Sequence, residues 1–373
     1  MSRLEYLIAG SVLRLLSLLF SLLPLNGHRV VLASARMTHL EGNLEYIRLE
    51  LDRLHPELDC ILLLERYGYG LSAKVGYLLR LVRAMYYVST SRLVVVDNAY
   101  LPVHVAPHRQ GTTVVQVWHA VGGLKRFGVD TLVAPLEPER TFLHRYYDYA
   151  VVSSEGTRTP AAAALRTPRE RVLALGTPRT DFFFDEAALL AARQQVLAAH
   201  PQLAGRQVVV YAPTFRGRGR RKRGAPGLDA VRLRAALPAD YALVLKTHPN
   251  LDPSLTEHAG YDVVVDPAFE INELLTVTDI LLTDYSSTIF EYALLGRPLL
   301  LLVPDLEEYE RDPGLYLDLR TEMIGTHVKD TDGVIEAIHD QRFDLSGYDA
   351  FLERHMGACD GHASERFVRH FLG

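Results

Sequence analysis

Short apolar runs alternate with longer amphipathic stretches from His28 onward. Runs such as Cys60–Leu64 and Arg92–Asp97 have apolar interiors, which is typical of strands buried on both faces of a parallel sheet. Apolar residues at helical spacing fill the intervals between the runs. In the first half of the chain the pattern predicts strands at residues 29–33, 60–64, 92–97, 113–118, 149–153 and 171–175, and helices at residues 43–55 and 72–88.

The same alternation resumes after a helix predicted at residues 186–200. Two successive sets of strands and helices predict two doubly wound α/β domains that face each other across a cleft. The second set has predicted strands at residues 207–211, 241–246, 261–266, 280–282 and 297–303, and helices at residues 330–341 and 348–371. The expected domain limits are 1–26 for an N-terminal helix, 27–190 and 191–345 for the α/β domains, and 346–373 for C-terminal helices.

The stretch Asp279–Gly296 combines a short apolar strand, a polar turn and a helix closed by glycine. Asp284, Ser286 and Ser287 are good N-cap residues, and Glu291 falls on the first turns of the helix. Such a turn aims unpaired backbone N–H groups and the positive end of the helix dipole at the space in front, which suits a phosphate or diphosphate. From these residues alone, an ordinary strand-to-helix turn is the alternative.

Residues 4–25 are rich in leucine and carry few charges. A signal peptide is disfavoured because no small-residue cleavage site follows. A spanning helix has the required length, but Arg14 lies in its middle and serines recur. We favour a membrane-associating helix that lies in the membrane interface, with its polar residues near one face. A helix buried against the protein itself is the third alternative.

Composition narrows the class of protein. A length of 373 residues, with 48% hydrophobic and 23% charged residues, fits a globular chain of more than one domain. A formal net charge of −5 argues against general nucleic-acid binding. Cys60 and Cys359 provide neither a disulfide framework nor a metal cluster, and suit a reducing cytoplasm.

The loop Arg216–Gly224 concentrates basic residues in a chain of acidic overall charge. A solvated loop tip is one explanation. An anionic partner is the other, and a membrane surface or a phosphate-rich substrate would serve, with a nucleic acid as a minor alternative.

Polar side chains follow several predicted strands at the edge where ligands bind in α/β domains. His119 follows the strand that ends at Trp118, and an imidazole there can act as a base. Basic side chains, hydroxyls and a helix N-terminus together make a suitable diphosphate site. For any one residue, a structural role is the alternative. The strand-end residues are Arg179, Thr214, Arg216, Lys246, His248, Ser286 and Ser287.

Several motifs that define other enzyme classes are missing from the sequence. The 15 histidines are scattered without metal-ligand spacing, and there is no Walker loop, Gly-x-Gly-x-x-Gly or Gly-x-Ser-x-Gly. Nicotinamide oxidoreductases, kinases and α/β-hydrolases thereby lose their usual signatures. No cofactor is expected, and a Mg²⁺ ion, if one is needed, would arrive with the substrate.

A set of motifs runs in consistent order over about residues 110–320. They are Trp118-His119 with a downstream Gly-Leu-Lys125, Gly176-Thr-Pro-Arg179, Tyr211-Ala-Pro-Thr-Phe-Arg216, Leu245-Lys-Thr-His-Pro249, Thr283-Asp-Tyr-Ser-Ser287 with Phe290-Glu291, and Gly296-Arg-Pro298, followed by Asp305, Tyr309, Arg311, Gly314, Tyr316 and Asp318. This order resembles the CDP-glycerol glycerophosphotransferases of teichoic acid synthesis. The resemblance implies a GT-B-like fold with an acceptor-side domain at 27–190 and a nucleotide-binding domain at 191–345. It also implies peripheral attachment to the cytoplasmic face of the cell membrane.

The resemblance implies roles for individual residues. His119 would be the general base and His248 a second catalytic residue near the leaving group. Glu291 would contact the ribose of the nucleotide. The residues implied in substrate binding are Trp118, Ala120, Val121, Gly122, Arg179, Pro213, Thr214, Arg216, Lys246, Thr247, Ser286, Ser287 and Glu291. The acceptor hydroxyl would attack the β-phosphorus of CDP-glycerol and release CMP, while positive groups neutralise the developing charge.

The chain departs from the family pattern after His119. Many members have Trp-His-Gly-Thr-Pro-Leu-Lys, whereas this chain has one more residue, Trp118-His-Ala-Val-Gly-Gly-Leu-Lys125. The form of this loop and the length of the chain are closer to those of the primases, which add the first glycerol phosphate to a polyprenyl-diphosphate disaccharide. A CDP-ribitol-dependent transferase or polymerase, a GT-B glycosyltransferase and a non-catalytic membrane module remain alternatives. Expected partners are CDP-glycerol, the lipid-linked acceptor and an anionic membrane, without nucleic acid; an oligomer is left open.

Overall fold

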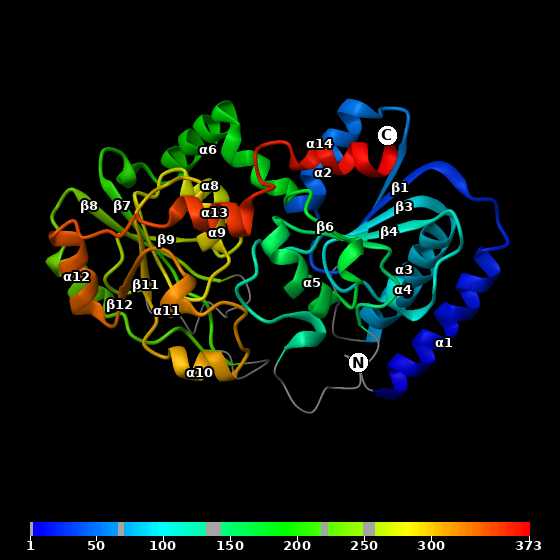
Figure 1. The fold of residues 1–373 in the computed structure, drawn as a ribbon, viewed down its shortest axis with the longest axis horizontal. Helices are drawn as coiled ribbons and strands as arrows, with labels where there is room; N and C mark the ends of the chain where they lie inside the picture. Colours follow the sequence, from blue (N-terminus) through cyan, green and yellow to red (C-terminus); the bar gives the residue numbers. More distant parts are fainter. Residues whose placement is uncertain (1–2, 66–70, 132–142, 218–222, 249–257) are drawn as a thin grey trace. The chain divides into compact units, whose positions relative to one another are not determined.

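The structure, a computed structural model, describes residues 3–65, 71–131, 143–217, 223–248 and 258–373 (Figure 1). Residues 218–222 of the basic loop therefore lie outside the described residues. The chain forms two compact units, Met1–Asp181 with Arg354–Gly373, and Phe182–Glu353. The sequence pattern instead places its domain limits at residues 190 and 345.

The first unit contains a parallel sheet with strand order β2-β1-β3-β4-β5-β6. Its strands are β1 (Asn26–Ser34), β2 (Asp59–Leu64), β3 (Ser91–Val96), β4 (Thr113–Gln116), β5 (Tyr149–Val151) and β6 (Val172–Leu173). The helices are α1 (Arg3–Phe20), α2 (Gly42–Leu54), α3 (Leu71–Thr90), α4 (Leu101–Val105), α5 (Arg158–Leu165) and α14 (Ala363–Leu372). A strand forms at each position predicted for this half, although β4 and β5 each end two residues early and β6 is only two residues long.

Helices cover both faces of this sheet, as its apolar strands require. Alternate residues of β1 point to opposite faces, so Val31 joins a core with α3, α4 and α5, while Val30 joins a core with α2 and α14. In α14, Phe367 and Val368 are fully buried in that second core. The C-terminal helix of the chain is therefore part of the first unit (Figure 1).

The second unit contains a parallel sheet with strand order β12-β11-β10-β7-β8-β9. Its strands are β7 (Gln207–Ala212), β8 (Tyr241–Lys246), β9 (Val263–Val265), β10 (Ile280–Thr283), β11 (Leu299–Leu302) and β12 (Thr326–Val328). The helices are α6 (Glu186–Ala199), α7 (Ala230–Ala236), α8 (Ile271–Leu275), α9 (Thr288–Ala293), α10 (Leu306–Arg311), α11 (Leu319–Glu322) and α12 (Thr331–His339), with α13 (Tyr348–Met356) leading back to the first unit. Two mixed α/β units, each with a doubly wound parallel sheet, confirm the predicted fold class.

Helix α1 packs on α3 and α4 through one narrow face. Leu13 is fully buried against Leu81, Met85 and Val105, and Arg14 Nε donates to the Val105 carbonyl at 2.7 Å. The remaining face is exposed and mostly apolar, although Ser11 and Arg14 are exposed too. Its large exposed apolar residues are Leu7, Ile8, Val12, Leu15, Leu18 and Leu19, followed by Leu22 and Leu23. Within the described ranges, no helix combines the length and apolar character needed to cross a bilayer.

Candidate active site

The turn predicted to bind a diphosphate lies at the topological switch point of the second sheet. Strand β10 pairs with β7, with Thr283 opposite Ala212, whereas β8 and β9 continue on the other side of β7. Thr214 and Arg216 follow β7, and Asp284 follows β10, so the two strand ends meet there. Ligands of open α/β sheets bind outside the carboxyl ends of strands at such a point.

Asp284 joins these two strand ends through its carboxylate. Its Oδ1 accepts from the Thr214 amide at 2.9 Å, from the Thr214 hydroxyl at 3.0 Å and from the Tyr285 amide at 2.7 Å. Its Oδ2 lies 2.9 Å from Arg216 Nη1. Since Asp284 is buried, these contacts satisfy a charge that would otherwise be costly inside the protein.

Arg216 is buried between two carboxylates and two aromatic rings. Its Nε and Nη2 donate to the two carboxylate oxygens of Asp305, at 2.6 and 3.1 Å. Its guanidinium carbon lies 4.9 Å from the centre of the Tyr285 ring and 5.0 Å from that of Tyr309. Burial would raise the pKa of Asp305, but the hydrogen bond and charge of Arg216 hold it below its ordinary value. Arg216 therefore fixes the shape of the switch point; contact with a diphosphate stays a prediction.

The polar turn continues into α9. Ser286 Oγ accepts from the Thr288 amide at 3.2 Å, and Ser287 is the N-cap residue without a side-chain capping bond. Glu291 is fully buried and accepts from Asn272 Nδ2 at 3.0 Å. The serines thus lie at the strand end as predicted, whereas the carboxylate predicted to contact ribose is engaged inside the unit.

Lys246, Thr247 and His248 follow β8, the strand beside β7. Lys246 Nζ donates to the backbone carbonyls of Asp266 at 3.0 Å and Pro267 at 2.7 Å. Burial lowers the pKa of Lys246 to about 8, which leaves it mostly protonated at neutral pH. The His248 ring packs edge-on against Phe215, with ring centres 5.0 Å apart. This second unit thereby collects Pro213, Thr214, Arg216, Lys246, Thr247, His248, Ser286 and Ser287 at three adjacent strand ends.

His119 and Arg179 lie in the first unit, His119 in the turn that follows β4 and Arg179 in the short 3-10 helix Pro178–Phe184 after β6. Strand β4 ends at Gln116 because Trp118 has a φ of 49°, in the left-handed region that a large L-residue rarely adopts. Arg179 Nη1 donates to the backbone carbonyl of His119 at 3.0 Å. Arg179, which was predicted to hold a diphosphate, is thus part of the support of the His119 turn.

Two buried amides also bind this turn. Gln116 Oε1 accepts from the Trp118 amide at 2.8 Å, and Asn43 Nδ2 donates to the Trp118 carbonyl at 2.8 Å. Asn43 Oδ1 accepts from the Arg179 amide at 3.1 Å. The sequence pattern did not indicate either amide, since each is an ordinary polar residue within or beside a regular element.

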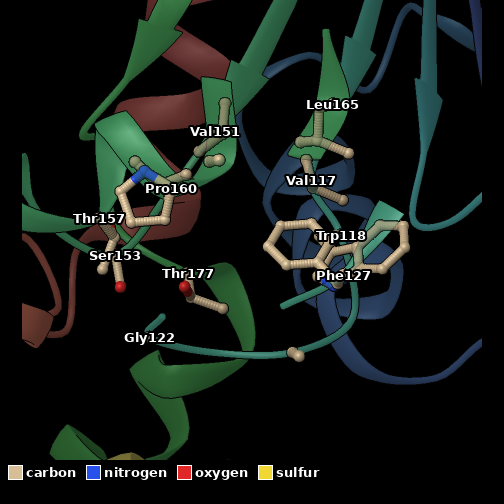
Figure 2. Close-up of a pocket in the computed structure, with 13 residues that line it drawn as sticks. Val117, Trp118, Gly122, Phe127, Val151, Ser153, Thr157, Pro160, Leu165 and Thr177 are labelled. Atoms are coloured by element: carbon tan, nitrogen blue, oxygen red, sulfur yellow. The ribbon is translucent and has the colours of Figure 1, made fainter. Parts of the chain in front are cut away.

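A small pocket lies beside the His119 turn (Figure 2). The Trp118 ring packs against Phe127, with centres 4.8 Å apart, and against His119 at 4.5 Å. The opposite part of the lining carries the hydroxyl-bearing residues Ser153 and Thr177 (Figure 2). Of the residues predicted to bind substrate, Trp118, Ala120 and Gly122 line the pocket, and Val121 is buried next to them.

The described residues contain no group of three or more His, Cys, Asp or Glu that could hold a metal ion. The described strand ends carry basic side chains, hydroxyls, imidazoles and the buried carboxylate of Asp284.

Comparison with known proteins identifies the relatives of the chain. Residues 15–373 match the family described as CDP-Glycerol:Poly(glycerophosphate) glycerophosphotransferase. The teichoic acid ribitol-phosphate primase of Bacillus spizizenii is 34% identical, over 97% of this chain and 95% of the relative. The teichoic acid glycerol-phosphate primase of Bacillus subtilis is 27% identical, over 78% of this chain and 76% of the relative. Against the B. spizizenii teichoic acid poly(ribitol-phosphate) polymerase, at 33% identity, the match spans 57% of the relative.

Solved structures agree on the fold. The wall teichoic acid polymerase TagF superposes with a TM-score of 0.76 at 19% identity, covering 99% of this chain and 96% of that chain. A likeness at this level of identity establishes the GT-B-like fold.

Proposed function

The chain belongs to the CDP-glycerol:poly(glycerophosphate) glycerophosphotransferase family, and we propose that it transfers a polyol phosphate from a CDP-activated polyol to a lipid-linked acceptor in wall teichoic acid synthesis. The observation that carries this proposal is the primase relative matched over nearly the whole of both chains. The polar strand ends of both units are chemically suited to the reaction.

The proposed reaction is a phosphoryl-type transfer. His119 takes the proton of the acceptor hydroxyl, whose oxygen attacks the β-phosphorus of the donor. The bond from that phosphorus to the bridging oxygen breaks, and CMP leaves with the bond electrons. Lys246 supplies positive charge to the diphosphate, and His248 stands by the leaving group. A protonated Lys246, with a pKa of about 8, suits that task at neutral pH.

We propose that the transferred group is ribitol phosphate. Glycerol phosphate, which the sequence motifs led us to expect, is the second candidate. The ribitol-phosphate primase is 34% identical to the chain, against 27% for the B. subtilis glycerol-phosphate primase. We further propose that the acceptor is of the primase type. It would be a polyprenyl-diphosphate disaccharide, or that disaccharide after a first polyol phosphate has been added.

A donor panel tests the proposal. The protein is incubated with an acceptor analogue and CDP-ribitol, CDP-glycerol or a UDP-sugar, and CMP and UDP are separated by chromatography. We expect acceptor-dependent CMP release, faster from CDP-ribitol. Consumption of only the UDP-sugar would identify a glycosyltransferase, and tight nucleotide binding without any turnover would identify a binding module.

We propose in addition that the exposed face of α1 attaches the protein peripherally to the cytoplasmic face of the membrane. The support is that Leu13 packs inward while leucines such as Leu15, Leu19 and Leu22 are 59%, 52% and 83% exposed. Each of these side chains would gain about 1.5–3 kcal/mol on full transfer out of water. An apolar helix face of this kind is typical of interfacial attachment.

Substituting two exposed leucines of α1 and one just beyond its end tests this attachment in the full chain. Leu15→Gln with Leu19→Gln and Leu22→Gln should move most of the protein from sedimented anionic vesicles to the supernatant. The matched control replaces Leu49, Leu190 and Leu345, which are also exposed but lie elsewhere, and should sediment like the wild type. Equal sedimentation of the two triple variants would contradict the proposal.

A further inference from the structure

We propose that Gln116 and Asn43 are positioning residues that hold His119 in place by binding the backbone of Trp118 from both sides. The inference rests on the proposed function only in taking His119 as the base. The contacts that support it are properties of the first unit and do not depend on which donor is used.

The backbone of Trp118 needs such support because its conformation is unfavourable. At a φ of 49° the Cβ of a non-glycine residue crowds the neighbouring peptide, and a bulky aromatic residue populates this region rarely. Conformations of this kind persist only where the surroundings over-determine them, and they cluster at functional sites. The strained residue here directly precedes His119.

Gln116 binds the N–H side of Trp118, and its own orientation is unambiguous. Its Nε2 donates to the Asn98 carbonyl at 3.0 Å and to the Tyr147 hydroxyl at 2.8 Å. Because a carbonyl can only accept, the amide nitrogen must face Asn98, and Oε1 must face Trp118. Gln116 has no exposed surface, so water cannot easily replace it.

A second layer fixes the hydroxyl that Gln116 contacts. The Tyr147 oxygen lies 3.1 Å from His144 Nδ1. Burial lowers the pKa of His144 to about 4, so the ring is neutral at physiological pH. Its Nδ1 can therefore accept a hydrogen bond from the Tyr147 hydroxyl. Gln116, Tyr147 and His144 therefore form a directed chain of hydrogen bonds beneath Trp118.

Asn43 binds the C=O side of Trp118. Its Nδ2 donates to the carbonyls of Trp118 at 2.8 Å and Val117 at 3.3 Å, and its Oδ1 accepts from the Arg179 amide. Arg179 Nη1 holds the next carbonyl, that of His119. Both polar backbone groups of Trp118 are thus bound by buried side-chain amides.

The indole ring connects this backbone support to the imidazole. The rings of Trp118 and His119 lie 4.5 Å apart with an interplanar angle of 34°, and Phe127 packs 4.8 Å from the indole. Release of the Trp118 backbone would let the indole shift, and the imidazole that packs on it would lose its position.

The test compares Gln116→Met, which keeps the length of the side chain but removes both hydrogen-bonding groups, with Gln116→Glu, which keeps the acceptor for Trp118. For Gln116→Met we expect kcat to fall on the order of 100-fold with unchanged affinity for the CDP-polyol, since a misplaced base impairs the chemical step. Gln116→Glu should recover part of kcat.

Trp118 is the only tryptophan in the sequence, so its fluorescence reports the same site independently of activity. Acrylamide quenching of that fluorescence should rise in Gln116→Met.

The matched control is Gln341→Met, which removes a Gln-to-Tyr241 hydrogen bond of 3.1 Å in the second unit and should leave kcat and quenching unchanged. Unaltered quenching in Gln116→Met would overturn the inference. If that variant fails to fold, Asn43→Leu removes the support on the other side and gives the same readout. A wild-type protein that consumes no CDP-polyol would refute the proposed function, while increased quenching in the variants would still establish the support of Trp118.

Discussion

Replacing His119 by glutamine is expected to lower kcat by about 10²–10⁴-fold, the usual contribution of a general base. The substitution should leave the turn in place, because the bond from Arg179 Nη1 goes to the backbone carbonyl of His119 and not to its imidazole. Affinity for CDP-ribitol or CDP-glycerol should therefore change little. The measurement is single-turnover CMP release, with donor affinity from equilibrium titration.

A histidine exposed on the surface provides the control. The side chain of His39 is 71% exposed beside Glu41, and His39→Gln should retain the wild-type rate. Near-wild-type turnover of His119→Gln would mean that another group takes the proton, and the base assignment would then be wrong.

Replacing Arg216 by methionine is expected to cost the second unit about 3–5 kcal/mol of stability, as for other buried ion pairs that lose one partner. The substitution leaves the carboxylates of Asp284 and Asp305 without the guanidinium that lies between them. Because the chain has two units, unfolding should be followed with a probe for each, and the loss assigned to the transition of the second.

Arg232→Met is the matched control, since it breaks an ion pair with Asp332 in which both side chains are more than half exposed. Such pairs contribute about 0–1 kcal/mol. If the two variants lose stability equally, the buried pairs contribute little, and Arg216 would be available for the diphosphate role that its motif implies.

The ion pair between Arg216 and Asp305 predicts that the stability of the protein depends on pH. The folded protein holds the pKa of Asp305 below its ordinary value, so its contribution to stability is fully present above that ordinary value. The contribution should disappear as the pH falls through the lowered pKa of the folded state. In Arg216→Met this acid sensitivity should diminish.

Local patterns were sufficient to predict most of the fold. The apolar run Tyr241–Lys246, for example, forms a strand with the predicted limits. A strand buried on both faces is apolar along its whole length, so the ends of the apolar run mark the ends of the strand. The edge strand Thr326–Val328 was not predicted, since three residues with a threonine and a histidine carry no apolar signal. The strand predicted to reach Trp118 stops at Gln116 because the side chains of Gln116 and of the distant Asn43 hold Trp118 outside strand geometry.

The candidate site was predicted in position more than in detail. Thr214 and Ser286 lie at the strand ends where the pattern places them, because parallel strands bring their carboxyl ends to one edge. The partners of those residues could not be predicted in the same way. Asn43 binds a turn 75 positions later, and Arg216 binds Asp305 across 89 positions. Hydrogen bonds of such separation leave no periodic trace in a single sequence.

The return of α14 to the first unit has a consequence for biosynthesis. The core that contains Leu44 and Ile47 of α2 is closed by Phe367 and Val368, which the ribosome adds more than 300 residues later. Domains generally fold as they emerge, N-terminal first. Here the nascent first unit must wait with an apolar face uncovered while the whole of the second unit is translated. During synthesis, therefore, the second unit can complete its core before the first.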